Sequence, residues 1–100
     1  MASRLRFHPE SLADLRDAIA WYAEISPRLA NRFRESVDRS LDQIEADPLL
    51  YAILFDDVRV VQTAAFPYLV HYRIRRDNPF VLGIFHGASD PGKWRARAQT

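Results

Sequence analysis

The spacing of apolar residues changes once along the chain, at Asp47-Pro48, and this change limits the possible folds more than any other feature. Before it, apolar side chains recur every three or four residues, which is the spacing of a helix that buries one face. After it, short runs rich in Val, Ile, Tyr and Phe predict strands. Because a proline pushes the preceding residue out of helical geometry, the helical part is expected to end at Asp47. A helical half followed by a stranded half predicts an α+β fold.

The helical half is expected to contain two helices with a very short connection. Pro9 suits the first turn of one helix, and Ser26-Pro27 supplies an N-cap and a first-turn proline for the next. The apolar faces are Leu12, Leu15, Ile19 and Tyr22 on the first helix, and Leu29, Phe33, Val37, Leu41 and Ile44 on the second. Two amphipathic helices so close in sequence predict an antiparallel helical hairpin.

The stranded half predicts three consecutive antiparallel strands, in addition to a short extended run before the first helix. The expected strands are 5–7, 58–63, 68–75 and 80–86. In the third of these, Tyr68, Val70, Tyr72 and Ile74 alternate with residues that are mostly polar or basic. We therefore expect the order β-α-α-β-β-β, with the helical hairpin packed on one face of a small, mostly antiparallel sheet and the other face open.

Length and composition narrow the class of protein. With 100 residues, of which 48% are hydrophobic and 27% charged, residues 1–100 are expected to form a single domain, with 90–100 a basic C-terminal tail that has room for a short turn of helix. No apolar run reaches the length of a membrane helix, and the N-terminus has no apolar signal core. The chain has no cysteine, which excludes disulfides and thiolate zinc sites. A cytoplasmic protein without a membrane partner is expected.

The net charge of +1 conceals an uneven distribution. Residues 1–57 hold seven arginines against eleven acidic residues, whereas residues 58–100 hold six arginines and one lysine against two aspartates. The near-neutral total argues against a general nucleic-acid binder, and the basic second half favours an acidic protein partner.

Four residues of the stranded half could converge on the open face of the sheet: Arg59, His71, Arg73 and His86. An imidazole beside guanidinium groups could take a proton from a ribose 2′-hydroxyl and stabilise a charged phosphorane. The alternative, which the spacing alone favours, is that these are solvated side chains on a half-exposed sheet.

Metal and cofactor sites are not expected. His8, His71 and His86 lie far apart in sequence, and no His-x-x-x-His pair is present. The three glycines form no phosphate-binding loop, and no serine lies in a nucleophile elbow.

Aromatic residues mark two further candidate contact sites. Trp94, beside Arg95 and Arg97, either anchors a contact patch or folds back onto the sheet as part of the core. At least one of Trp21 and Tyr22 is expected in the core, and an exposed aromatic there would mark a partner groove. The acidic residues of the first helix are expected in solvent; they are Glu10, Asp14 and Asp17.

One ordered set of residues runs along nearly the whole chain. It comprises Phe7-His8-Pro9-Glu10, Asp14-Leu15, Trp21-Tyr22, Ser26-Pro27, Leu29-Ala30, Arg32-Phe33, Ile44, Pro48, Arg59, Phe66-Pro67-Tyr68, Tyr72, His86, Asp90-Pro91, Trp94 and Arg97. In this set the chain resembles the RelE/ParE superfamily of type II toxin-antitoxin toxins. The resemblance implies a cytoplasmic toxin held inactive in a hetero-oligomer by a cognate antitoxin, whose acidic C-terminal segment packs across the hairpin and the sheet.

The resemblance is to the ParE branch, whose members poison DNA gyrase, more than to the RelE branch, whose members cleave mRNA on the ribosome. When the middle strand is aligned by Tyr72, Leu69 stands at the position of the RelE catalytic arginine, and Lys93 is the only lysine. Ala88 and Ser89 stand where the family often has arginine. We expect gyrase inhibition by binding, without covalent chemistry.

Two alternatives stay open. One is a ribosome-dependent mRNA endonuclease that uses His86 or His71 for proton transfer, with Arg59 and Arg73 on the phosphate. The other is a degenerate homologue that binds antitoxin and has lost toxicity. The residues expected to contact antitoxin or target are Arg59, Arg73, His86, Trp94, Arg95 and Arg97.

Overall fold

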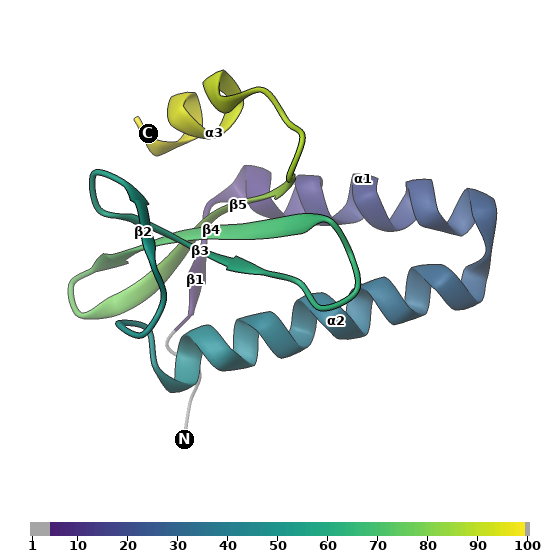
Figure 1. Cartoon of the computed structure of the whole chain (residues 1–100), viewed down its shortest axis with the longest axis horizontal. Helices are drawn as coiled ribbons and strands as arrows, with labels where there is room; N and C mark the ends of the chain where they lie inside the picture. Colours follow the sequence, from purple (N-terminus) through teal and green to yellow (C-terminus); the bar gives the residue numbers. More distant parts are fainter. Residues whose placement is uncertain (1–4, 100) are drawn as a thin grey trace.

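A helical hairpin lies against one face of a five-stranded sheet in the computed structural model, which describes residues 5–99 (Figure 1). The elements are β1 (Arg6–Phe7), α1 (Pro9–Ile25), α2 (Pro27–Ala46), β2 (Ile53–Phe55), β3 (Val58–Gln62), β4 (Tyr68–Arg75), β5 (Asn78–His86) and α3 (Pro91–Ala98). Residues 1–4 and 100, which the predicted domain and tail include, lie outside the described residues. Within 5–99, no helix is both long and apolar enough to span a bilayer.

Local capping defines both long helices. The Nδ1 atom of His8 accepts a hydrogen bond from the Glu10 amide at 3.1 Å, and the Ser26 hydroxyl accepts from the Leu29 amide at 3.4 Å. Each cap is followed by a proline, whose missing N–H costs nothing in a first helical turn. Ser26 is the only residue between the two helices, so the predicted helical hairpin is confirmed.

The sheet has the strand order β1-β5-β4-β3-β2. The pair β1 and β5 is parallel and the other pairs are antiparallel, as the prediction of a mostly antiparallel sheet requires. The four expected strands are confirmed, but β2 was not predicted. It has three residues and meets β3 in an irregular register through a turn at Asp56, whose φ is 48°. A strand this short has no alternation that a sequence pattern could reveal.

The main core lies between the hairpin and the sheet. Its fully buried side chains include Phe33, Val37, Ile44, Val70, Tyr72 and Val81. The Tyr72 hydroxyl donates to the Pro48 carbonyl at 2.6 Å, tying the end of α2 to the sheet, and burial raises the pKa of Tyr72 to about 12. The expected buried face of α1 is wrong at its first position, because Leu12 is 53% exposed.

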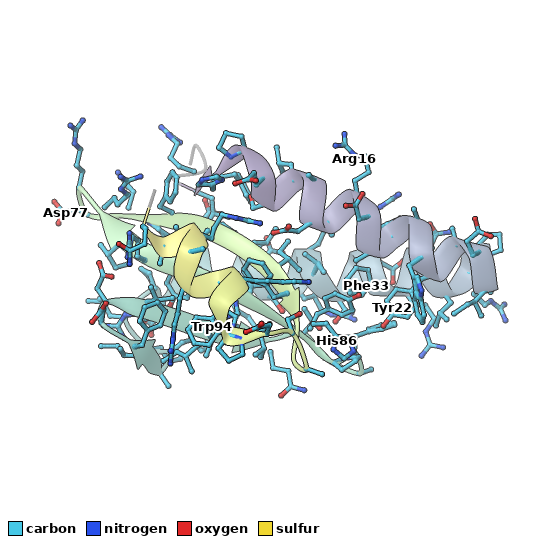
Figure 2. All side chains as sticks on the ribbon, turned by 90° about the horizontal axis from the view of Figure 1, so that it is seen from above. Arg16, Tyr22, Phe33, Asp77, His86 and Trp94 are labelled. Atoms are coloured by element: carbon cyan, nitrogen blue, oxygen red, sulfur yellow. The ribbon has the colours of Figure 1, made fainter. Side chains whose placement is uncertain are left out.

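A third helix covers part of the sheet face that was expected to be open. Figure 1 shows α3 on one side of the sheet and α2 on the other, and Figure 2 shows α3 lying across the strands from above. The Asp90 carboxylate caps α3 by accepting from the Gly92 amide at 2.8 Å. Ala98 packs there with Val58 and Leu82 in a second, smaller core. The prediction of an open second face is therefore wrong where α3 lies.

Candidate functional site

The four residues expected on the open face of the sheet, Arg59, His71, Arg73 and His86, do not all converge there. Arg59 pairs with Tyr72 across β3 and β4, so its side chain lies on the same face of the sheet as the Tyr72 ring, the face that packs on the helical hairpin. Its Nη1 atom donates to the Tyr51 carbonyl at 2.7 Å and to the Leu49 carbonyl at 3.3 Å. The expected convergence of Arg59 with His71 is wrong, because the register separates them by the thickness of the sheet.

His71 is buried on the α3 side, with 1% of its surface exposed. The Trp94 ring stacks on it at a centroid distance of 5.5 Å, and the Phe85 ring meets it edge-on at 5.1 Å. Burial disfavours the charged imidazolium and lowers the pKa of His71 to about 4. Its Nε2 atom has no hydrogen-bond partner among residues 5–99. A neutral imidazole closed off in this way cannot reach a nucleic-acid substrate.

Arg73 is held by internal contacts on the same side of the sheet. Its guanidinium pairs with Asp57 at 3.0 Å and donates to the Ala98 carbonyl at 2.9 Å, so it fastens the end of α3 to β4. His86 is exposed at the end of β5, with its Nδ1 atom accepting from the Ala88 amide at 3.0 Å. His86 is thus the only one of the four that faces solvent freely within the described chain.

Trp94 and Arg97 fold back onto the protein. Trp94 also contacts Phe55 at 4.9 Å and is partly buried, so it folds back onto the sheet, and its role as a contact residue stays a prediction. The Arg97 side chain is only 12% exposed and forms two hydrogen bonds with the Asp14 carboxylate, at 2.8 and 3.1 Å. These bonds raise the pKa of Arg97. Arg95 is exposed and lies 5.2 Å from the Trp94 ring, a cation–π distance.

β1 ends at Phe7, and beyond that point the side chains of Arg97 and Asp14 lie against the edge of β5. Arg97 Nη1 donates to the Leu82 carbonyl at 2.9 Å, and Asp14 Oδ2 accepts from the Ile84 amide at 3.2 Å. β1 pairs with β5 only at Phe80 and Val81, so the two side chains supply the hydrogen bonds that a longer β1 would make. The expectation that Asp14 lies in solvent is wrong, because it is partly buried in this contact.

An apolar groove opens at the other end of α1. Trp21 is 61% exposed and Ile25 is 60% exposed, and together with Tyr22, Pro67, Tyr68 and His86 they line a hollow of about 500 Å³. Tyr22 is buried against Phe33, so the expectation that at least one of the two adjacent aromatics is in the core is confirmed, and Trp21 is the exposed one. Sequence reasoning missed Ile25 as a surface residue because it continues the apolar spacing of α1.

The groove continues between α1 and α3 as a second hollow of about 570 Å³ with walls of opposite charge. Glu10 and Asp17 line it from α1, and Lys93 lines it from α3. Trp21, Tyr68 and His86 belong to both hollows and join them. No three histidine or acidic side chains between residues 5 and 99 are grouped so that they could hold a metal ion. The arrangement is suited to binding an extended or helical protein segment that has both apolar and charged side chains.

Comparison with known proteins agrees with the fold. A family model described as "ParE toxin of type II toxin-antitoxin system, parDE" matches residues 5–91. The protein Toxin ParE2 of Mycobacterium tuberculosis, from two strains, is 33% identical over 95 residues, covering 91% of this chain and 88% of the relative.

Two solved structures share the fold. One is described as the chromosomal ParDE TA system from P. aeruginosa; it has a TM-score of 0.73 and 17% identity, covering 82% of this chain and 92% of that one. The other is a mutant of the E. coli toxin RelE in the free state, with a TM-score of 0.67 and 16% identity, covering 99% of this chain and 96% of that one. The fold of Figure 1 is therefore similar to that of these two structures over most of the chain.

Proposed function

The chain belongs to the ParE toxin family of type II toxin-antitoxin systems, and from this membership we propose that it inhibits DNA gyrase by binding and is neutralised by a cognate antitoxin. The observation that supports action by binding, rather than by RNA cleavage, is that the residues a nuclease would need do not lie together. His71 is buried and neutral, and Arg59 contacts loop carbonyls on the opposite face of the sheet. A toxin that acts by binding needs no assembled proton-transfer group.

The apolar groove of Trp21 and Ile25 is the proposed binding site of the antitoxin. An exposed tryptophan in a hollow is the kind of residue that dominates binding energy when a partner covers it. In the second hollow, which continues this groove, Lys93 and the exposed His86 can bind the carboxylates of an acidic segment. The groove runs from α1 to the end of the sheet, so a segment lying in it would touch both layers of the fold. Of the contacts predicted from the sequence, His86 and Arg95 are accessible to such a partner.

The target is tested with two parallel reactions. Purified toxin is added to a gyrase supercoiling reaction and, separately, to translating ribosomes analysed by primer extension. We expect loss of supercoiling and intact mRNA. Unchanged supercoiling together with codon-specific cuts would establish the RelE-type endonuclease instead. If both reactions proceed unchanged while antitoxin still binds, the chain is the degenerate homologue.

The proposed binding site of the antitoxin is tested by calorimetry with the cognate antitoxin. Trp21→Ala is expected to weaken binding by tenfold or more, because a buried aromatic anchor contributes about 2 kcal/mol or more to an interface. Since Trp21 is 61% exposed in the free toxin, the melting temperature should change little. Leu54→Ala is the matched control, because Leu54 is also exposed and apolar but lies on β2. Equal affinity of Trp21→Ala and wild type would show that the antitoxin binds elsewhere.

A further inference from the structure

The β4–β5 hairpin extends beyond the rest of the sheet as a two-stranded ribbon. In the described pairing, β3 reaches β4 no further than Tyr72, and β1 pairs with β5 only at Phe80 and Val81. Residues 74–79 therefore pair only with each other, around a turn at Arg76 and Asp77. Figure 2 shows Asp77 at one end of the molecule and Tyr22 and His86 toward the other, so the ribbon is remote from the apolar groove.

Three arginines surround a hollow at the base of this ribbon: Arg6 of β1 and Arg75 and Arg76 of the hairpin. The other residues that line it are Asn78, Pro79 and Phe80, so no acidic side chain belongs to its wall. The Arg75 guanidinium lies 4.6 Å above the Phe80 ring, which holds it in place by a cation–π contact. All three arginines are exposed, and none takes part in the ion pairs formed among residues 5–99.

The turn of the ribbon places Arg76 in a backbone conformation that is unfavourable for arginine. Arg76 and Asp77 have φ values of 50° and 67°, the left-handed geometry that a two-residue hairpin turn requires. Asn and Gly adopt this geometry more readily than Arg, for which it costs about 1 kcal/mol or more. No contact of the Arg76 side chain within the described chain offsets this cost. A strained residue without internal compensation points to selection for a role outside the fold.

We propose that this arginine ribbon, residues 74–79 together with Arg6, binds the phosphate backbone of duplex DNA. Guanidinium groups bind phosphate oxygens in bidentate geometry, and the major groove, about 12 Å wide, admits a two-stranded β-ribbon. An acidic protein segment is a weaker fit, because exposed ion pairs contribute only about 0 to 1 kcal/mol each and the binding energy of protein interfaces comes mostly from buried anchor residues. The exposed large apolar side chains of residues 5–99 all lie outside the ribbon.

The proposed site is a local cluster of positive charge, so it is compatible with a net charge of only +1 for the whole chain. Under the proposed function the ribbon would touch the DNA that gyrase holds while the rest of the toxin contacts the enzyme. DNA binding by the toxin alone does not depend on that target, so the two proposals can fail separately.

The test is a fluorescence-anisotropy titration of a labelled mixed-sequence DNA duplex with the free toxin at 50 to 200 mM salt. The variant Arg75→Gln/Arg76→Asn is compared with Arg32→Gln/Arg39→Gln, which removes the same charge from exposed positions of α2. The ribbon variant is expected to bind about tenfold more weakly at 50 mM salt, and its log–log salt slope should fall in magnitude by about 2, roughly one for each phosphate that the variant no longer neutralises. The α2 control should keep wild-type affinity within about twofold.

Folding and competing partners are controlled in the same experiment. Arg76→Asn relieves the strained turn, so the melting temperature of the ribbon variant should equal or exceed that of wild type. Equally weakened binding in the ribbon and α2 variants would overturn the proposal, because it would show a diffuse charge effect. Preferential binding of single-stranded RNA, or ribbon-dependent binding of a glutamate-rich peptide but not of DNA, would overturn it as well. Gyrase inhibition without any DNA binding would refute this inference and leave the proposed function intact.

Discussion

The contact between Asp14 and Arg97 is expected to contribute more to stability than any other ion pair among the described residues. Asp14→Ala removes two hydrogen bonds to a guanidinium that is only 12% exposed and leaves the Ile84 amide without its acceptor. Removing one partner of a buried pair costs about 3 to 5 kcal/mol, because the other charge stays buried without that partner. Arg97 keeps a contact with the Glu10 carboxylate at 3.5 Å, and both side chains of the pair keep some contact with water. We therefore expect the lower end, a decrease of about 3 kcal/mol in the free energy of unfolding.

The assay is urea unfolding at pH 7, followed by tryptophan fluorescence and far-ultraviolet circular dichroism. Arg97→Met keeps the length of the side chain and leaves Asp14 bonded to Ile84, so it should cost less, about 1 to 2 kcal/mol. The double variant should be more stable than the sum of the single effects predicts, with a coupling of about 2 kcal/mol, because each single change takes from the remaining charge its shortest ion-pair contact. Asp17→Ala, on the same helix but exposed, is the control and should lie within about 0.5 kcal/mol of wild type.

The reasoning would be refuted if the two single effects added in the double variant. Additive effects would mean that Asp14 and Arg97 act independently and that the edge of β5 does not depend on their contact. A destabilisation below about 1 kcal/mol for Asp14→Ala would lead to the same conclusion, because it would place the Arg97 charge in water rather than between α3 and the edge of β5.

Two further variants test the packing beneath α3. His71 has a pKa of about 4 when folded and an ordinary value of 6.5, so the unfolded chain binds more protons between these values. The stabilisation from a neutral His71 should therefore be fully present above about pH 6.5, and the free energy of unfolding should fall by about 2 kcal/mol from pH 7 to pH 5. His71→Phe should flatten this slope, and an unchanged slope in that variant would refute the assignment. Gly83→Ala places a methyl group against the Phe85 ring and 2.9 Å from Arg97 Nη1, so thermal unfolding should show a destabilisation of about 1 to 3 kcal/mol, and wild-type stability would contradict this packing.

Most of the layout was predictable because its determinants are local. A cap followed by a proline marks the start of each helix of the hairpin, at His8-Pro9 and Ser26-Pro27, and the alternation in β4 identifies the face that meets the helices. These signals act within a few residues, so a sequence pattern detects them. β2 escaped prediction because three residues are too few to show a period.

The candidate site was less predictable because it depends on contacts between distant parts of the chain. Asp14 and Arg97 are 83 residues apart, and nothing in the spacing of α1 indicates that one of its acidic residues meets the tail. The alternation in β4 shows a polar face at His71 but cannot show that Trp94 covers it. The register that puts Arg59 on the opposite face from His71 is likewise set by the strand pairing and not by either strand alone.

The cations of the second half of the chain consequently divide into an internal group and two external ones. Arg59, Arg73 and Arg97 are bound to carbonyls or carboxylates of the fold, so the net charge of residues 58–100 overstates what a partner meets. Arg75 and Arg76 remain exposed on the ribbon, and Lys93 and Arg95 remain exposed on α3. Substitutions at the two external groups should therefore impair binding with little effect on stability, whereas substitutions in the internal group should lower stability first. If a substitution in the internal group weakens binding, the effect shows a direct role in binding only when the melting temperature of the variant is unchanged.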